Sequence, residues 1–251
     1  MNGVSRQELL IHSVARLLKD CRSIAVGASS PIPGAGALLA RHWAAGETPS
    51  RRLFLTILGS RHLNSMTSGG VELFDMAAQG RIDAFFLGGG QIDGEANINL
   101  VGAGGAYPQT AVRWPGSFGS AYLYYLVPRV ILFREEHTRR VMVPKVDFIS
   151  APGPRNDGVY RPGGPLGLLT NLCWFSFDKA RRRFVLQTVH PGHTLEEVRD
   201  NTGFAFDSSA RPVAATALPD AAALAAIRGP IARQIAEAYP RFVKQVFPDA
   251  A

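Results

Sequence analysis

Residues 85–121 read FFLGGGQIDGEANINLVGAGGAYPQTAVRWPGSFGSA. An apolar run at 85–87 leads into a first glycine turn, a second apolar run at 96–101 leads into another, and residues 113–120 form a third. Any one of these glycines fits a tight turn between strands. Three such turns after apolar strands favour more than that, because open α/β sheets bind ligands where their strands end. The stretch therefore predicts an α/β fold with a binding site here.

The third turn supplies the strongest candidates for chemistry. Backbone N–H groups in a glycine-containing turn can hold an anion or a developing oxyanion. The candidates for this role are Gly116, Ser117, Phe118 and Gly119. Two interpretations stay open for Gly119, which either leaves room for a ligand or supplies a positive φ angle that other residues avoid. Asp83, Asp93 and Glu95 are acids near these turns, and each alone fits a solvated or capping carboxylate.

Composition sets the class of protein. The chain has 251 residues, 46% of them hydrophobic and 19% charged, which is typical of a folded soluble protein. We predict one α/β domain over residues 1–251 with a helical C-terminal segment from about residue 220 to residue 251. The chain holds only Cys21 and Cys173 and no CxxC, so a reduced, cytoplasmic setting is expected. Neither a signal-peptide pattern nor a membrane-spanning apolar run is present.

The chain is basic, with a formal net charge of +7 and a pI near 9.8. No nucleic-acid-binding motif accompanies this charge, so nucleic acid is not an expected partner. Acidic small ligands such as phosphates and carboxylates explain the excess more economically. His190 and His193 stand three residues apart without other ligands at metal-binding spacing, and a turn before a helix explains the Pro-Gly between them. Ser-His-Asp catalysis finds no G-x-S-x-G elbow.

Strands and helices alternate along the chain, which predicts an open, mainly parallel sheet flanked by helices. The first half is expected to fold as an amphipathic helix at 5–20 capped by Ser5 and Glu8, a strand at 23–27, a turn at 31–36, a helix at 37–45, a strand at 52–58, a helix at 71–79 and a strand at 82–87. Gly34 and Gly36 lack the third glycine and the later acid of a dinucleotide site.

The second half continues the pattern. We expect a helix at 122–126, a strand at 129–133, short strands at 140–143 and 146–149, a long loop at 151–165, a strand at 167–177, a turn at 178–182, a strand at 183–189, a helix from 194 to 203 and helices over 220–247. The last segment is expected to break near Gly229-Pro230 and at Pro240.

Four segments, in order, resemble motifs of the β subunits of class I coenzyme A transferases. They are GGQID with NIN (89–93, 97–99), RWPGSFGSA (113–121), GGP with LTNLCWFSFD (163–165, 169–178) and HPGHTLEEV with NTGF (190–198, 201–204). The resemblance covers about residues 5–205. It implies an α/β fold, a partner α subunit in an α2β2 assembly, and acyl-CoA at the subunit interface as substrate with no further cofactor. The residues it places near coenzyme A are Gly89, Gly90, Gln91, Asn97, Asn99, Ser60 and Arg61.

One departure from the family bears on the reaction. The transferases carry a nucleophilic glutamate after the second buried strand, and residues 56–60 of this chain, TILGS, have no carboxylate there. Phe118 also stands where the family usually has glycine. The chain is similar to a branch of the family whose members are the β subunits of actinobacterial steroid ring-cleaving hydrolases. That branch implies C–C bond hydrolysis in a cyclic β-keto acyl-CoA, with the essential glutamate on the α subunit. The alternatives are a true CoA-transferase β subunit and a non-catalytic scaffold subunit.

Overall fold

The computed structural model describes residues 3–47, 52–155, 158–210 and 212–248. By its internal contacts the chain divides into two compact units. The first holds Met1–Met76, Arg81–Phe86 and Ala217–Ala251, and the second holds Ala77–Gly80 and Leu87–Thr216. The expectation of a single domain over residues 1–251 stays a prediction, and residues 249–251 of its helical C-terminal segment lie outside the described part.

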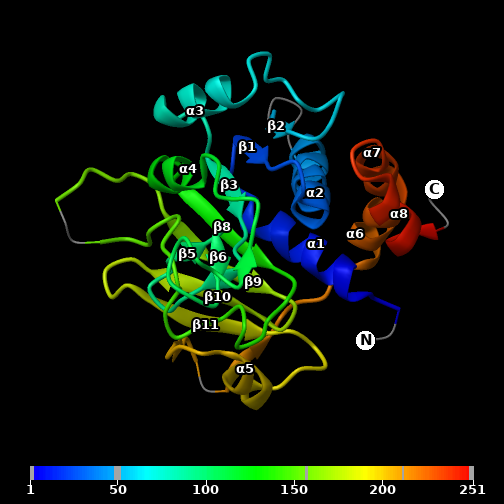
Figure 1. Ribbon diagram of the computed structural model, residues 1–251. Coiled ribbons are helices and arrows are strands. Elements are labelled where there is room, and N and C mark those ends of the chain that lie inside the picture. Colours follow the sequence, from blue (N-terminus) through cyan, green and yellow to red (C-terminus); the bar gives the residue numbers. More distant parts are fainter. Residues whose placement is uncertain (1–2, 48–51, 156–157, 211, 249–251) are drawn as a thin grey trace. The chain divides into compact units, whose positions relative to one another are not determined.

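The first unit is built on short parallel strands between helices (Figure 1). Its elements up to the third strand are α1 (Arg6–Leu17), β1 (Ser23–Val26), α2 (Pro31–Glu47), β2 (Phe54–Ile57), α3 (Gly70–Ala78) and β3 (Ala84–Leu87). β1 lies between β2 and β3 and pairs in parallel with both. The predicted capping box is confirmed, because Glu8 N donates to Ser5 Oγ and Ser5 N donates to Glu8 Oε2.

α2 begins earlier than the sequence pattern predicts. Residues 31–36 were expected to form a turn, and they form the first turns of the helix instead. Pro31 occupies the first position of the helix, where a backbone N–H has no partner within the helix and its loss costs nothing. The prolines that indicated a turn therefore mark a helix start, and that part of the prediction is wrong.

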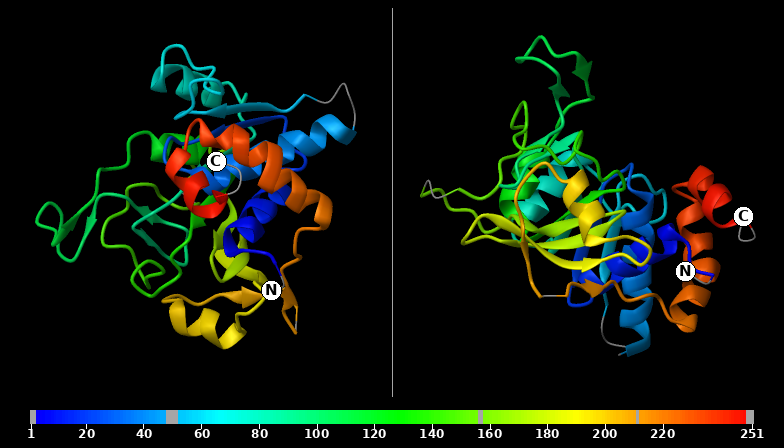
Figure 2. Two further views of the ribbon diagram at one scale, coloured as in Figure 1. Left: turned by 90° about the vertical axis from the view of Figure 1, so that its right-hand side faces the viewer. Right: turned by 90° about the horizontal axis from the view of Figure 1, so that it is seen from below.

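The C-terminal segment is helical and belongs to the first unit. It consists of α6 (Ala221–Ala226), the π-helical turn η1 (Ile227–Ile231), α7 (Ala232–Ala236) and α8 (Pro240–Val246). These helices pack against α2, and Figure 2 shows them lying over α1 and α2. Pro230 lies inside η1, at the predicted break, because a proline removes a helical hydrogen bond. Arg228 Nε donates to the buried Glu8 Oε1 at 2.5 Å and ties the segment to α1.

The second unit holds the larger strands. They are β8 (Arg129–Arg134), β9 (Pro165–Thr170), β10 (Cys173–Asp178), β11 (Arg183–Val189), β12 (Asp207–Ser208) and β13 (Ala214–Ala215). β8 and β9 are parallel, β9, β10 and β11 are antiparallel, and β12 and β13 each pair in parallel with β11. The smaller elements are β4 (Gln91–Ile92), β5 (Ile98–Asn99), β6 (Gly102–Ala103), β7 (Val112–Arg113), α4 (Ser120–Leu126) and α5 (Leu195–Asn201).

Two strand predictions in this unit are wrong. The strand expected at 167–177 is two strands, because the Thr170 hydroxyl accepts hydrogen bonds from Leu172 N and Cys173 N and closes a turn between them. The strands expected at 140–143 and 146–149 are irregular. Pro144 has no N–H for a ladder, and in this region only isolated bridges form, from Ile92 to Met142 and from Ile98 to Ala151.

The predicted fold class is confirmed. Pairings within the larger sheets are mostly parallel, and helices flank the strands. β3 is buried along its whole length, as expected for a strand covered on both faces. Within the described residues, we find no helix with the length and apolar character needed to cross a membrane.

Candidate functional site

Gln91 and Asn99 form a buried polar frame beneath the first two glycine turns. Asn99 Nδ2 donates to Gln91 Oε1 at 2.8 Å and to Gly102 O at 2.7 Å. Asn99 Oδ1 accepts from Val101 N at 3.0 Å, and Gly90 N donates to Asn99 O at 2.9 Å. Asn99 is fully buried and its amide groups are occupied within the chain. The structure therefore gives these side chains a framework role, and direct contact with coenzyme A stays a prediction for them.

Asn97 belongs to a second local frame, centred on Asp93. The Asp93 carboxylate accepts from the backbone N–H groups of Glu95 and Asn97 and from the Asn97 amide. Asn97 Oδ1 accepts from Gly153 N at 2.9 Å. Asp93 is thus a capping carboxylate, the simpler of the roles considered for it. Asp83 acts in the same way in the first unit, where it accepts from Arg22 N and Ser23 N.

Trp114 joins the third glycine turn to the first. Its backbone N–H donates to Val101 O at 3.0 Å, and its ring lies over Gly90. A Cβ atom at Gly90 would lie 2.3 Å from the ring carbon Cη2, which is closer than real Cβ contacts. The structure thus brings Gly90, Gln91 and Asn99 together with the start of the turn that holds the oxyanion-type candidates.

The conformation of that turn separates the two interpretations of Gly119. Gly116 has a φ angle of +108° and Phe118 one of +43°, whereas Gly119 has a φ of −93° and forms the N-cap of α4. The interpretation that Gly119 is needed for a positive φ is therefore wrong. Gly116 is the position that needs glycine on backbone grounds. Phe118, the departure from the family pattern, is 83% exposed and points its ring toward solvent.

The turn also presents unused backbone donors. The N–H groups of Gly116, Ser117 and Gly119 donate no hydrogen bond to any residue that the structure describes. Ser117 O accepts from Ser120 N at 2.8 Å, which fixes the shape of the turn. Fixed N–H groups without a competing acceptor suit the binding of an oxyanion.

Ser60 and Arg61 lie in the first unit, in the loop after β2, and contact a residue that the sequence did not indicate. The buried Ser60 hydroxyl donates to Glu237 Oε2 at 2.5 Å, and Arg61 N donates to Glu237 Oε1 at 2.8 Å. These hydrogen bonds, with that of Ser60 first, lower the pKa of the Glu237 carboxyl. Glu237 stands directly after α7, and no motif marks it as a partner of residues 60–61.

The TN and HPG segments of the sequence motifs meet in a buried network of the second unit that includes His137. His137 Nδ1 lies 2.8 Å from Thr170 Oγ1, and its Nε2 lies 2.9 Å from Thr202 Oγ1. His190 contacts Thr170 O through Nε2 at 2.9 Å. Burial is the main cause that lowers the pKa of each histidine to about 4. His137 is a second residue that sequence reasoning missed, because it lies outside the recognised segments.

His193 does not share a ligand site with His190, since its Nδ1 contacts Glu197 Oε2 at 2.9 Å instead. Among the described residues there is no group of three or more His, Cys, Asp or Glu side chains that could hold a metal ion.

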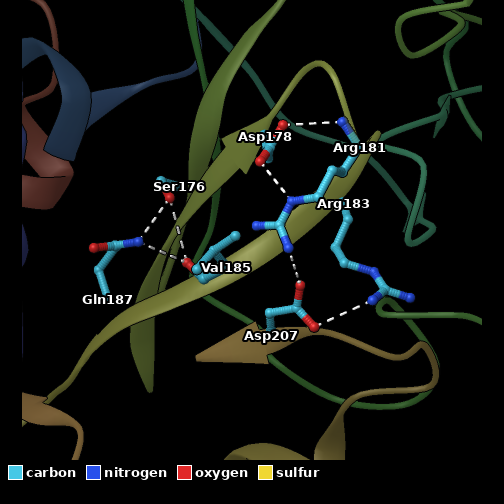
Figure 3. Close-up of polar contacts among 7 residues, drawn as sticks. All are labelled: Ser176, Asp178, Arg181, Arg183, Val185, Gln187 and Asp207. Carbon is cyan, nitrogen blue, oxygen red and sulfur yellow. Dashed lines mark hydrogen bonds and ion pairs between the residues drawn. The ribbon is translucent and has the colours of Figure 1, made fainter. Parts of the chain in front are cut away.

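A surface hollow of about 760 Å³ opens beside β12, lined by Arg181, Arg199 and residues 204–209 among others. Figure 3 shows that its basic side chains are balanced by acids. Arg181 is held between Asp178 and Asp207, and Arg183 also contacts Asp207. Partly exposed ion pairs of this kind contribute little to stability, so their main effect is to fix the turn before β11 onto β12.

Comparison with known proteins decides the family. The sequence profile described as coenzyme A transferase matches residues 56–201, more than half of the chain. The chain belongs to the coenzyme A transferase family. This confirms the resemblance read from the four ordered segments, three of which lie almost wholly within the matched region.

Within this family, one of the two kinds of polypeptide in a 3-oxoadipate CoA-transferase from Pseudomonas knackmussii is 35% identical over 172 residues. That match covers 66% of this chain and 65% of the relative, so it spans just under two thirds of the relative's length. The IpdB subunit of a cholesterol ring-cleaving hydrolase from Rhodococcus jostii is 31% identical over 143 residues, which cover 53% of each chain.

Solved structures of the family share the fold. The decarboxylase AibA/AibB superposes with a TM-score of 0.75 at 26% identity, over 90% of this chain and 94% of the other. The Rhodococcus jostii IpdAB structure has a TM-score of 0.74 at 24% identity, with the same coverage. At that identity the likeness shows the fold alone. Reaction, substrate and partner therefore rest on the residues of this chain.

Proposed function

We propose that this chain is the β subunit of a heteromeric hydrolase that opens the ring of a cyclic β-keto acyl-CoA from steroid degradation by hydrolysing a C–C bond. The partner is an α subunit that carries the catalytic glutamate, in an α2β2 assembly. Support comes from the IpdB relative, whose name describes a cholesterol ring-cleaving hydrolase subunit, and from the two-chain names IpdAB and AibA/AibB of the similar structures.

The observation that carries the proposal is the loop after β2. Residues 58–61, Leu-Gly-Ser-Arg, contain no carboxylate where the family's transferases carry their nucleophile. The acid that reaches this loop is Glu237, and both of its oxygen atoms accept hydrogen bonds from it. Such bonds stabilise the carboxylate and lower its basicity, which weakens it as a nucleophile. Attack by water fits this loop better than covalent transfer through a glutamate.

The proposed reaction needs a base, a water molecule and groups that stabilise negative charge. The base on the partner removes a proton from water, and the resulting hydroxide adds to the ring ketone. The bond from that carbonyl carbon to the carbon beside the thioester then breaks, and its electron pair becomes a thioester enolate. Protonation of the enolate carbon and loss of the acid proton leave a ring-opened carboxylate that still carries its CoA thioester. The free N–H groups of Gly116, Ser117 and Gly119 suit the developing negative charge.

A second function, transfer of CoA between carboxylic acids, is favoured by the 3-oxoadipate CoA-transferase relative, which matches at higher identity and over a longer segment than the hydrolase relative does. Transfer would need a nucleophile other than the residues of the β2 loop.

The test uses the complex co-expressed with its α subunit and a cyclic β-keto acyl-CoA in oxygen-18 water. Hydrolysis places one labelled oxygen in the new carboxylate and leaves the CoA thioester intact, with no dependence on an added carboxylic acid. Borohydride or hydroxylamine trapping with peptide mass analysis is the control, and it is expected to find no CoA-derived mark on any glutamate of this chain. Acid-dependent exchange of CoA, or such a mark, would establish the transferase function instead.

A further inference from the structure

The loops that follow β1 and β2 leave the same edge of the sheet in the first unit. The two strands are parallel, with Val26 opposite Ile57, and Leu58 N donates to Val26 O at 3.0 Å just beyond them. The carboxyl edge of parallel strands is where open α/β sheets bind ligands. The shape of these two loops therefore bears directly on any ligand bound at this edge.

The chain just after α7 contacts both loops through two side chains. Tyr239 Oη donates to Gly27 O at 3.1 Å and accepts from Ser30 N at 3.3 Å, which holds the loop after β1. Glu237 accepts hydrogen bonds from the loop after β2. Only one residue separates the two in the chain, so a single segment braces both loops.

Glu237 makes the more extensive of the two contacts. Its Oε2 accepts from the Ser60 hydroxyl and its Oε1 from Arg61 N. The Ser60 oxygen in turn accepts from His62 N at 3.2 Å and Leu63 N at 2.9 Å. Because the only hydroxyl hydrogen of Ser60 goes to Glu237, its lone pairs face these two N–H groups. One carboxylate thus organises the backbone donors of residues 61–63.

We propose that Glu237 is a positioning residue that holds residues 60–63 in the shape needed to bind the CoA thioester. The loop lacks a carboxylate of its own, and the C-terminal segment supplies one as a brace rather than as a nucleophile. The inference rests on the proposed function only in that residues 60–61 face coenzyme A. It holds equally for hydrolysis and for transfer.

The experiment compares Glu237→Gln with Glu72→Gln in the α/β complex. Glu72 is a matched control, since its carboxylate also accepts loop hydrogen bonds in the first unit, from Thr67 N, Thr67 Oγ1 and Ser68 N. We expect Glu237→Gln to speed amide hydrogen exchange in residues 61–63 about tenfold or more, the scale of one lost hydrogen bond to a charged group. Coenzyme A binding, measured by calorimetry, should weaken about tenfold. Glu72→Gln should change neither quantity.

A second variant keeps the proposal testable from the other side of the bond. Ser60→Ala removes the hydroxyl that Glu237 accepts from, so the double variant should be no weaker in CoA binding than the more affected single variant. Unchanged exchange in residues 61–63 would show that Glu237 does not hold the loop. Faster exchange with unchanged CoA affinity would show a purely structural brace, and either result overturns the proposal. Calorimetry needs no turnover, so the outcome is independent of which reaction the complex catalyses.

Discussion

At the scale of single residues, the buried histidines show how hydrogen bonding fixes a protonation state. Thr202 Oγ1 donates its hydrogen to Val198 O at 2.6 Å, so it accepts from His137 Nε2–H. His137 Nδ1 then carries no proton and accepts from the Thr170 hydroxyl, whose oxygen already accepts from two backbone N–H groups. A second proton on His137 would have no acceptor, in agreement with a pKa near 4.

This network predicts a loss of stability in mild acid. The pKa values of His137 and His190 in the folded chain, about 4, lie below the unfolded value of 6.5. Between these values the unfolded chain binds protons that the folded chain does not. The contribution is therefore fully present above pH 6.5 and is lost as the pH falls toward 4, by roughly 3 kcal/mol for each histidine. Melting temperatures of the complex from pH 7 to pH 4 should fall accordingly.

The control for this pH dependence is His190→Asn. It should lower the melting temperature at pH 7, because the contacts to Thr170 and Thr216 change, and it should make the fall with pH shallower. A pH slope identical to that of the unmodified complex would show that His190 does not titrate on unfolding and would contradict the prediction.

At the scale of elements, patterns with a single local cause were predictable and those that depend on distant partners were not. The capping box of α1 could be read from Ser5 and Glu8 alone. The start of α2 could not, because proline suits a turn and a first helical position equally well. The break between β9 and β10 depends on one hydroxyl, that of Thr170, in a run that otherwise reads as continuous strand.

The turn at residues 116–119 carries the prediction for this scale. Gly119 has an ordinary φ angle, so Gly119→Val should fold, and its added bulk should obstruct the N–H groups beside it. We expect kcat/KM of the complex to fall on the order of a hundredfold, the scale of a lost oxyanion donor. Ser117→Ala should cost less, because the backbone donor remains. Thermal melting and turnover measured on the same preparation separate the two effects.

Gly116→Ala is the matched variant for backbone strain, because it places a side chain at a φ of +108° where nothing crowds the added carbon. It should lower the melting temperature, while Gly119→Val should not. Normal turnover by an assembled Gly119→Val complex would remove the turn from the active site and would favour the scaffold interpretation.

At the scale of the whole molecule, the sequence predicted the α/β class and the family, because both depend on ordered motifs and on alternating apolar strands and helices. The contact between Glu237 and Ser60 was not predictable, since it joins residues 177 positions apart through a side chain outside every motif. Site residues that looked like ligand contacts, such as Asn99, proved to be occupied within the chain. Polar residues in a motif can thus serve the framework of a site.

The last prediction concerns dependence on the partner. No carboxylate with a free oxygen lies on the β2 loop among the described residues, and the unused N–H groups of residues 116–119 need a base that this chain does not place beside them. Large aromatic side chains are also exposed, with Phe118 at 83% and Tyr160 at 86%, as is common where another protein binds. The purified single chain should therefore be inactive and poorly soluble, and co-expression with the α subunit should restore both properties. Size-exclusion chromatography and acyl-CoA turnover on the same samples test this. A monodisperse single chain that turns over acyl-CoA at the rate of the complex would show that the catalytic groups all lie in this chain.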